Sequence, residues 1–445
     1  MTSDNGRLKA SIMPWVGLGI LIVFSLWSFL DKQMFGLLLT QIADSLQLSD
    51  TKMGTLQGVA FSLTYSTGVL LTGWLVDRYS PRLVIFWGVM FWSLSAAASG
   101  LANSFGSMFL ARAGVGLGEA ALMPAAFALM AALLPRDKLS FATGAFNLGN
   151  NLGGIVAFLF GGQVIASLVS HGGITLPVVG HVLPWQAAFI ATGLPGVLLA
   201  FLIFAVPWNK PDRSAGSRYS AENTSWAAFG AFVRQNARLV VGHIMAAGFL
   251  GTMTYAVISW SATFLVRTFD WTPAEVGAVL ALGVGCGGVA NLVLGALCDY
   301  LRRRGVLDSI HWVYIASTLI GIPLTYLTFV VAKGWIVVPL YALVWMVPNS
   351  WGAFNSAPLL IAPSHFHGKI IAVQTTVVGI MGLGFAPLLV GVITDYVFHD
   401  KSQVGHSISL ATAVCGTIAI GLTLIARTRM ADAVRAVEAA TPAKA

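Results

Sequence analysis

The chain has 445 residues, of which 57% are hydrophobic and only 9% are charged, and its formal net charge is +8. A soluble domain carries about 25% charged residues, so this composition excludes a water-facing surface over most of the chain, and most of that surface must face lipid. The basic residues stand in short polar segments between apolar ones, which gives the positive charge a topological cause and speaks against a nucleic-acid partner.

The hydrophobic segments are long enough to cross a bilayer, which takes roughly 20 mostly apolar residues per helix. The apolar stretch from Ile12 is too long for a cleavable signal peptide and is predicted to be the first span. The sequence predicts twelve transmembrane helices, at residues 13–40, 53–76, 83–102, 106–134, 139–168, 185–207, 239–267, 273–298, 309–332, 336–361, 369–394 and 407–427.

This order of spans predicts an all-α polytopic membrane protein of two pseudo-symmetric six-helix bundles. We expect an N-terminal bundle at 1–208, a polar cytoplasmic linker at 209–238, and a C-terminal bundle with a short cytoplasmic tail at 239–445. With both termini in the cytoplasm, 19 of the 25 Lys and Arg residues fall in cytoplasmic segments and four fall in outer loops. Positive residues collect on the cytoplasmic side of membrane proteins, so this bias sets the predicted orientation.

Two segments of the chain repeat each other. Gly73-Trp-Leu-Val-Asp77-Arg78, followed by Arg82, matches Gly295-Ala-Leu-Cys-Asp299-Tyr, which precedes three arginines. Each segment ends the second predicted span of its half. Parallel half-repeats predict two bundles related by an axis along the membrane normal, with a substrate path between them.

The motif Gly73-x-Leu-x-Asp77-Arg78-x-x-x-Arg82 resembles the signature loop between helices 2 and 3 of major facilitator transporters. It departs from that pattern at Ser80, where Gly is usual, and at Pro81, where a basic residue is common. The resemblance implies a major facilitator fold and a gating role for this loop. Gly73, Asp77, Arg78, Arg82 and Asp299 are therefore predicted gating residues, with Asp77 acting as a latch near a helix N-terminus or as a static cap.

Within that superfamily the chain is most similar to bacterial members of the spinster group. The resemblance covers nearly the whole chain, and the matching stretches are Phe29–Lys32, Arg112–Ala120 with Pro124, Gly193–Gly196, Trp271–Gly277 and Thr394–Phe398. Anion–cation symporters of the same superfamily share the charged residues of helices 1 and 4. The resemblance therefore implies a lipid-like or amphiphilic substrate and leaves a small organic anion as the alternative.

Away from the ends of the predicted spans, the charged residues are few, namely Asp31, Lys32, Arg112 and Glu119. Each costs roughly 2.5–3.5 kcal/mol at the centre of a membrane helix, so such residues face the protein interior and are functional candidates. Arg112 and Glu119 are seven residues apart, which separates them by about 10 Å along a helix and by only about 20° around it. Both side chains therefore point the same way.

Asp31, Arg112 and Glu119 are predicted to handle substrate and protons. A partly desolvated carboxylate can carry a proton at neutral pH, and a nearby Arg competes with that proton and attracts an anionic substrate group. The alternative is a buried ion pair that holds the N-terminal bundle together. Lys32 stands where the family commonly has Arg and lacks the bidentate geometry of Arg, so it is a weaker candidate for the cavity wall.

The second half has no charged residue away from the ends of its spans, but its seventh and tenth helices carry polar and aromatic side chains. Tyr255, Trp260, Asn349 and Asn355 are predicted cavity-lining residues, with packing or interface anchoring as the alternative. Asn147, Asn150 and Asn151 in the fifth span are predicted to form hydrogen bonds between helices, and lining of a cavity is the alternative, for which Asn147 and Asn151 are the candidates. Glycines and Pro387 in the eleventh span predict a segment that can bend.

The sequence lacks a phosphate-binding loop, a dinucleotide-binding turn, a nucleophile elbow and a zinc-binding motif, so we expect no enzyme activity, cofactor or metal. We expect a monomeric, proton-coupled secondary transporter of the bacterial inner membrane, working by alternating access as a symporter or antiporter. Its partners would be the bilayer, the proton and a lipid-like substrate. A non-transporting membrane receptor or sensor on the same scaffold is the alternative from another class.

Overall fold

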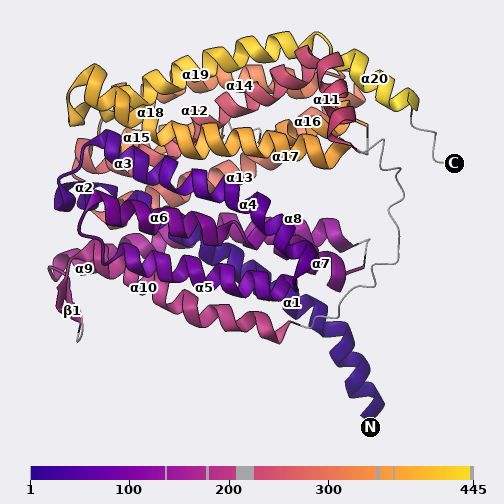
Figure 1. Ribbon diagram of the computed structural model, residues 1–445. Coiled ribbons are helices and arrows are strands. Elements are labelled where there is room, and N and C mark those ends of the chain that lie inside the picture. The colour runs from indigo at the N-terminus through magenta and orange to yellow at the C-terminus, as the bar shows by residue number, and fades with distance from the viewer. Residues whose placement is uncertain are drawn as a thin grey trace. The chain divides into compact units, whose positions relative to one another are not determined.

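The computed structural model describes residues 2–135, 138–176, 180–206, 225–346, 351–363 and 366–440. Within these ranges eleven helices are long and apolar enough to cross a membrane, and a shorter apolar helix covers Gly334–Met346. Figure 1 shows the helices in their order along the chain. The prediction of an all-α polytopic membrane protein is confirmed.

The first half of the chain forms six spans, several of them built from more than one helix. Short π-helical turns at Thr55–Val59 and Ala157–Gly161 join neighbouring helices, and a 3-10 turn covers Ala200–Ala205. The helices are α1 (Thr2–Leu37), α2 (Leu39–Leu46), α3 (Asp50–Gly54), α4 (Ala60–Arg78), α5 (Pro81–Ser99), α6 (Phe105–Glu119), α7 (Leu122–Leu133), α8 (Leu139–Val156), α9 (Gly162–Ser170) and α10 (Pro184–Leu199).

The second half repeats this plan. Its π-helical turns cover Leu327–Val331, Gly379–Phe385 and Ile393–Phe398, and its 3-10 turns cover Gly334–Ile336 and Lys401–Gln403. The helices are α11 (Trp226–Gln235), α12 (Ala237–Phe269), α13 (Pro273–Arg303), α14 (Ser309–Tyr326), α15 (Val337–Met346), α16 (Trp351–Ile361), α17 (His367–Val378), α18 (Ala386–Val392), α19 (Val404–Arg427) and α20 (Met430–Ala440).

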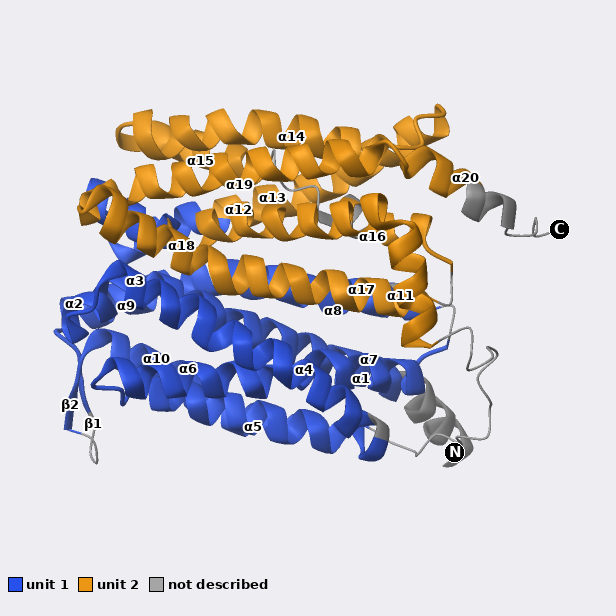
Figure 2. Cartoon of the chain, turned by 45° about the horizontal axis from the view of Figure 1, so that its top comes forward, with its two compact units in different colours: residues 1–212, 261–281 blue, residues 213–260, 282–445 orange. Residues whose placement is uncertain are grey.

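The chain divides into two compact units (Figure 2). Unit 1 consists of residues 1–212 and 261–281, and unit 2 consists of residues 213–260 and 282–445. Unit 1 therefore contains the adjoining tips of α12 and α13 as well as the first six spans. The predicted boundaries of the two bundles, at 208 and 239, remain a prediction.

Three elements were not predicted from the sequence. A β-hairpin pairs β1 (Ile174–Leu176) with β2 (Gly180–Val182) in antiparallel register, and it is a useful landmark for one end of unit 1, called here the hairpin end. Helix α11 lies inside the segment expected to be a polar linker, and α20 lies inside the expected polar tail. Both helices are short and amphipathic, so a search for long apolar runs does not detect them.

Helix α11 has a clear physical origin. The Ser225 hydroxyl caps its first turn by accepting a hydrogen bond from the backbone N–H of Ala228 at 3.0 Å. Its apolar face packs against the rest of unit 2. The ring centroids of Phe229 and Phe232 lie 5.5 and 5.4 Å, respectively, from that of Phe366. The cap residue and this aromatic spacing are the sequence signals that would have identified the helix.

The eleventh span changes its winding where the sequence predicts a segment that can bend. Residues Gly379–Phe385 form a π-helical turn between α17 and α18. A π-helical turn contains one residue more than an α-helical turn, which loosens the regular pattern of backbone hydrogen bonds. Such turns occur often at functional sites. Thr252 of α12 donates a hydrogen bond to the Met381 carbonyl in this turn at 3.1 Å, which fixes it against the seventh span.

Helix α6 packs closely on α5 because glycine stands at the contact. A Cβ atom on Gly118 would lie 2.5 Å from the Trp92 backbone nitrogen and 2.9 Å from the Gly88 carbonyl oxygen. We expect Gly118→Ala to destabilise the purified protein by about 1–3 kcal/mol, because overpacking forces the two helices apart. The measurement is the thermal unfolding midpoint in detergent. Gly106→Ala on the same helix is the control, because its Cβ would meet nothing within 4 Å.

Candidate functional site

The four charged residues predicted inside the spans all lie in unit 1. Asp31 and Lys32 are on α1, and Arg112 and Glu119 are on α6. Asp31, Arg112 and Glu119 are almost completely buried, with 3%, 3% and 2% of their surface exposed. Burial of three charged side chains in a membrane helix bundle is costly unless they balance one another, so their mutual arrangement determines what this site can do.

Glu119 forms its ion pair with Lys32. The distance from Lys32 Nζ to Glu119 Oε2 is 2.5 Å. The sequence favoured Arg112 as the basic residue that competes with the proton and gave Lys32 a minor role, so this pairing raises the importance of Lys32. The Lys32 side chain keeps 25% of its surface exposed whereas Glu119 keeps 1%, which makes Lys32 the accessible member of the pair.

Aromatic rings surround the two basic groups. The guanidinium of Arg112 lies 4.5 Å from the ring centroid of Phe35 and 5.6 Å from that of Phe61. The ammonium of Lys32 lies 5.3 Å from the Phe61 centroid and 5.5 Å from that of Tyr65. Cations in this position are attracted to the ring faces. Phe35, Phe61 and Tyr65, called here the aromatic wall, therefore stabilise both cations without adding negative charge.

The carboxylates have few hydrogen-bond partners. Neither oxygen of Asp31 has a hydrogen bond of regular geometry among the described residues, although the side chain of Thr192 approaches it. The second oxygen of Glu119, Oε1, is also buried without such a bond. Buried polar groups in proteins are nearly always satisfied, and an exception needs an explanation. Acceptor atoms left open in this way are suited to bind a proton.

The four groups interact electrostatically as one cluster. Asp31 is affected by Glu119, Arg112 and Lys32, and Arg112 is affected by both carboxylates. Two carboxylates and two basic groups sum to zero formal charge when all four are ionised. Uptake of one proton leaves a net charge of +1, which is the state that would attract a single negative group.

Glycine on α6 brings the aromatic wall to the site. A Cβ atom on Gly116 would lie 2.6 Å from the Thr64 hydroxyl oxygen and would also collide with the Phe61 backbone, so α4 can reach α6 only because this position has no side chain. Phe61 and Tyr65 are on α4 and stack on each other at 5.5 Å. The glycines of α6 therefore allow a neighbouring helix to pack closely, and the charged residues of α6 lie in the space that this packing encloses.

The predicted polar residues of the fifth span separate into two groups. Asn147 and Asn151 are exposed on α8, whereas Asn150 lies closer to α1 and accepts a hydrogen bond from the Ser25 hydroxyl at 2.8 Å. This bond joins α1 to α8, which is the role between helices that the sequence predicts for the asparagines of this span. Asn147 and Asn151 remain candidates for lining a cavity.

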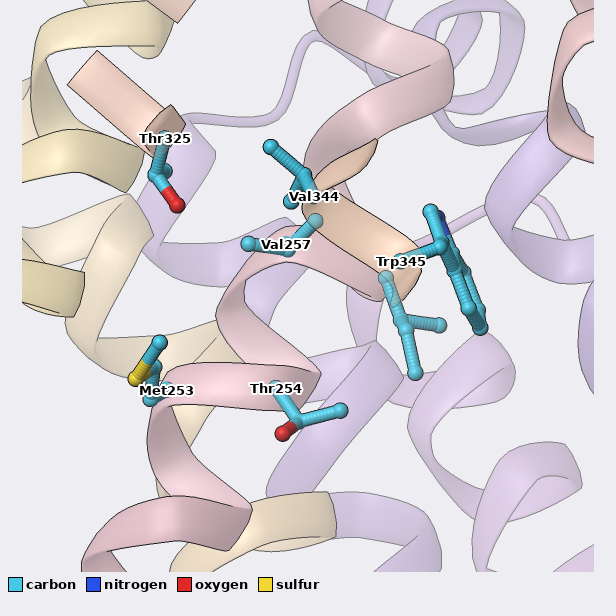
Figure 3. Close-up of a pocket in the computed structure, with 7 residues that line it drawn as sticks. Met253, Thr254, Val257, Thr325, Val344 and Trp345 are labelled. Atoms are coloured by element: carbon cyan, nitrogen blue, oxygen red, sulfur yellow. The ribbon is translucent and has the colours of Figure 1, made fainter. Parts of the chain in front are cut away.

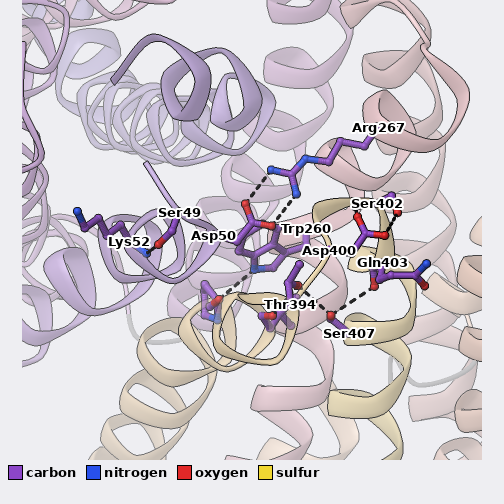
Figure 4. Close-up of polar contacts among 12 residues, drawn as sticks. Ser49, Asp50, Lys52, Trp260, Arg267, Thr394, Asp400, Ser402, Gln403 and Ser407 are labelled. Carbon is purple, nitrogen blue, oxygen red and sulfur yellow. Dashed lines mark hydrogen bonds and ion pairs between the residues drawn. The ribbon is translucent and has the colours of Figure 1, made fainter. Parts of the chain in front are cut away.

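The candidates in the second half lie in unit 2. Trp260 is fully buried, and its indole N–H donates to the Pro387 carbonyl at 3.0 Å, so it ties α12 to α18 (Figure 4). The Tyr255 ring lies beside Gly382. A Cβ atom added to Gly382 would be only 2.9 Å from that ring. Asn349 lies outside the described residues, and the side chain of Asn355 lies outside them as well.

Unit 2 also contains a small apolar cavity (Figure 3). Its volume is about 30 Å³, which is the space of a single water molecule. Its walls come from α12, α14 and α15 and are mostly hydrophobic: Met253, Thr254, Val257, Ile258, Thr325, Val344 and Trp345. The polarity of unit 2 at this position is thus much lower than that of the charged cluster in unit 1.

The residues of the predicted gating loop have individual contacts. Arg78 stacks on the Trp74 ring at 4.2 Å, and Arg82 donates a hydrogen bond to the Val206 carbonyl at 2.8 Å, which ties the loop to the end of the sixth span. Gly73 has open space around it, and Asp299 is exposed. The side chain of Asp77 lies outside the described residues, so its latch role stays a prediction.

A buried ion pair at the hairpin end was not predicted. Arg267 near the end of α12 donates to both oxygens of Asp50 at the start of α3, with distances of 2.6 and 2.8 Å (Figure 4). Asp50 is fully buried. The pair connects the tip of the seventh span to the first half of the chain. Acids and bases are common in short polar segments. The sequence alone therefore does not distinguish Asp50 or Arg267 from a residue exposed to solvent.

Glycine packing supports this contact. A Cβ on Gly277 of α13 would collide with the Phe158 carbonyl, and a Cβ on Gly162 would collide with the Pro273 carbonyl. Next to these contacts unit 1 has a cavity of about 720 Å³, whose lining includes Thr40, Gln41, Asp44 and Trp271. At the hairpin end of unit 1, closely packed helices therefore lie next to an open cavity.

Comparisons with known proteins identify similar chains. The model of the Major Facilitator Superfamily matches residues 21–387. An MFS-type efflux pump of Mycolicibacterium smegmatis is 25% identical, and the match covers 92% of each chain. A probable L-galactonate transporter of Escherichia coli is 24% identical, with 88% of this chain and 83% of the relative covered.

Among solved structures, a bacterial homolog of the human lysosomal transporter Spinster, in an inward-facing and unoccupied conformation, superposes with a TM-score of 0.77. It is 20% identical, and the superposition covers 97% of this chain and 99% of that one. At this level of identity the similarity establishes the shared fold.

Proposed function

The chain belongs to the Major Facilitator Superfamily, and on that premise we propose that it is a proton-coupled secondary transporter of an amphiphilic anion that works by alternating access. The observation that supports this most directly is the cluster of Asp31, Lys32, Arg112 and Glu119. Its formal charge is zero when all four groups are ionised, and its carboxylate oxygens are buried with open acceptor sites.

Proton binding would control access to the basic groups. When Glu119 is ionised it holds Lys32 at 2.5 Å, and the ammonium is then satisfied. A proton on Glu119 removes the charge that holds Lys32 and leaves the cluster with one excess positive charge. A negative head group then meets Lys32 and Arg112 with Asp31 as the one ionised carboxylate of the cluster. Proton and anion therefore favour each other's binding, which is the thermodynamic requirement for coupling.

The amphiphilic character of the substrate follows from the surroundings of the charged cluster in unit 1. The cluster suits a negative head group, and the aromatic wall beside it suits an adjoining apolar portion. A molecule with one charged end and one apolar end would match both features, in agreement with the similarity to spinster proteins.

Sidedness follows from the distribution of basic residues. We place both termini in the cytoplasm of a bacterial cell and the hairpin end at the outer face of the inner membrane, because 19 of 25 Lys and Arg residues then face the cytoplasm. The Asp50–Arg267 pair would then act as an outer gate. It must open for the outward-facing state, and closing it would accompany access from the cytoplasm.

A small organic anion is the second candidate substrate. One relative is named as a probable L-galactonate transporter, and a sugar acid has a carboxylate that Arg112 and Lys32 could bind. The sugar acid would have to bury its hydroxyl groups against polar partners. In the aromatic wall, only Tyr65 has a hydroxyl group that could bind a sugar hydroxyl. This shortage of polar partners favours the amphiphilic substrate over the sugar acid.

Reconstitution into liposomes with a trapped pH-sensitive dye tests the function. We would add lysophospholipids and sugar acids in parallel and follow the internal pH under a clamped membrane potential. Substrate-dependent acidification with a lysophospholipid supports the proposal, and acidification with a sugar acid alone selects the second candidate. Transport of either substrate with no movement of protons would contradict proton coupling.

A further inference from the structure

The cavity at the hairpin end of unit 1 has the features of a ligand-binding site that the proposed transport does not use. Its volume of about 720 Å³ lies within the roughly 300–1,000 Å³ that small-molecule sites occupy. Its walls come from α2, the end of α9, the start of α10 and the adjoining tips of α12 and α13, all within unit 1. The apolar part of the lining consists mainly of Leu37, Val169, Leu183, Val266 and Val276.

One side of α2 supplies most of the polar groups of the cavity. They stand at positions i, i+1, i+4 and i+5 of the helix, which places them on one face: Thr40, Gln41, Asp44 and Ser45. The opposite face of α2 is buried through Leu39, Ile42 and Ala43. Within the described part of the chain, the four polar side chains form no hydrogen bond or ion pair. Their donors and acceptors are therefore open to a bound molecule.

A buried indole N–H also belongs to the cavity. Trp185 at the start of α10 lines it, yet only 2% of the surface of this residue is exposed. Its Nε1–H has no hydrogen-bond partner among the described residues. The indole N–H can only donate, and a buried Trp usually has an acceptor for it. An acceptor atom of a bound molecule would supply the missing partner.

The charge around the cavity favours a cation. Asp44 is exposed, and it is the one ionisable residue among the described residues of the lining. The segments 38–55 and 261–281, which contribute to the walls, contain four acidic and two basic residues. Trp271 adds an aromatic ring to the lining, and Trp attracts cations more strongly than the other aromatic residues do. An organic cation is therefore attracted to this cavity and an anion is repelled.

We propose that this cavity binds an organic ammonium compound that also carries a hydrogen-bond acceptor. The ammonium group pairs with the Asp44 carboxylate, and the acceptor receives the Trp185 N–H. The apolar body of the compound lies against Val266 and Val276. The charged cluster of unit 1 attracts anions, so the two sites recognise molecules of opposite charge.

Equilibrium binding of dansylcadaverine to the full-length protein in lipid nanodiscs tests the proposal. This probe has a primary ammonium group, a sulfonyl acceptor and an aromatic body, and its fluorescence anisotropy reports binding without any transport. We expect saturable binding that Asp44→Asn weakens about fivefold, because the ion pair with an exposed carboxylate is lost. Asp44 is exposed, so this variant is expected to fold. Trp185→Phe keeps an aromatic ring but lacks the N–H, and it should also weaken binding about fivefold.

A neutral probe and a second acidic residue provide the controls. N-acetylated dansylcadaverine should bind the wild-type protein and Asp44→Asn equally, and it should still bind Trp185→Phe more weakly. Asp270→Asn removes one negative charge at the same end of unit 1 but outside the cavity lining, and Asn tolerates the positive φ of 53° at this position. We expect it to leave binding unchanged.

Three results would overturn the proposal. One is the absence of saturable binding of the charged probe to the wild-type protein. Another is equal affinity of that probe for the wild-type protein and for Asp44→Asn. The third is a loss of affinity in Asp270→Asn as large as that in Asp44→Asn, which would show a general attraction to negative charge in place of a built site.

Discussion

Replacement of Glu119 by Gln is expected to reduce substrate-driven proton movement into liposomes by roughly 100-fold, which corresponds to about 2.7 kcal/mol. Gln has nearly the shape of a protonated glutamic acid but cannot release the proton. The cluster would then carry one excess positive charge permanently, because the Glu119 carboxylate beside Lys32 is replaced by a neutral amide. The substrate should still bind and still exchange across the membrane, because the basic groups remain. The measurement is internal pH together with counterflow of labelled substrate.

The matched control is Glu275→Gln, because Glu275 is a glutamate outside the cluster. It accepts hydrogen bonds from the backbone and hydroxyl of Thr272 at 2.9 Å in a capping box at the start of α13, and Gln can maintain that role. Proton movement should be unchanged in this variant. Wild-type proton movement in Glu119→Gln would show that the cluster serves only to hold α1 against α6.

Replacement of Asp50 by Asn is expected to open the hairpin end. Arg267 would lose its bidentate carboxylate and keep one neutral acceptor, in a site where its side chain is only 15% exposed. Thr263 lies one helical turn deeper on α12 and is buried. With Thr263→Cys in a background lacking Cys286, Cys298 and Cys415, we expect a membrane-impermeant maleimide to react about tenfold faster, equivalent to about 1.4 kcal/mol.

Charge reversal and a surface acid provide the controls. Exchanging the two charges, Asp50→Arg with Arg267→Asp, should bring the labelling rate back towards that of the parent. Asp400→Asn should have no effect, because Asp400 is an exposed turn residue whose bonds from the Ser402 hydroxyl and backbone N–H lower its pKa and keep it ionised (Figure 4). Identical labelling in parent and Asp50→Asn would show that the pair does not keep this end closed.

The spans were predictable because their physical signal is strong and local. A stretch of about 20 apolar residues has few alternatives to a membrane helix, and eleven of the predicted spans have counterparts that begin and end within a few residues. The tenth predicted span corresponds to α15 and α16, separated by residues outside the description. The β-hairpin, α11 and α20 were missed because their signals are short caps and narrow apolar faces.

The members of the charged cluster were predictable, but their pairing was not. Charge inside an apolar span is rare enough to single out Asp31, Lys32, Arg112 and Glu119. Which base meets which acid depends on how α1 is rotated against α6, and that rotation is set by packing over the whole bundle. The sequence therefore placed Arg112 beside the carboxylates, whereas the contact at 2.5 Å belongs to Lys32.

The Asp50–Arg267 pair shows a second limit. Its two residues are 217 positions apart in the sequence. Acids and bases are common near the ends of spans, so neither residue attracts attention without its partner. The interaction exists only once the fold has brought distant helices together, and one sequence without relatives gives no measure of that proximity.

The zero formal charge of the cluster in unit 1 has an energetic consequence for the cell. A carrier that returns empty and neutral, and that moves one proton together with one monoanion, is not driven by the electrical part of the proton-motive force. Its accumulation limit is set by the pH difference alone, at about tenfold for each pH unit, or about 1.4 kcal/mol. Under the proposed coupling of one proton to one monoanion, cells that maintain a large membrane potential but a small pH difference would obtain little concentrating power from this protein.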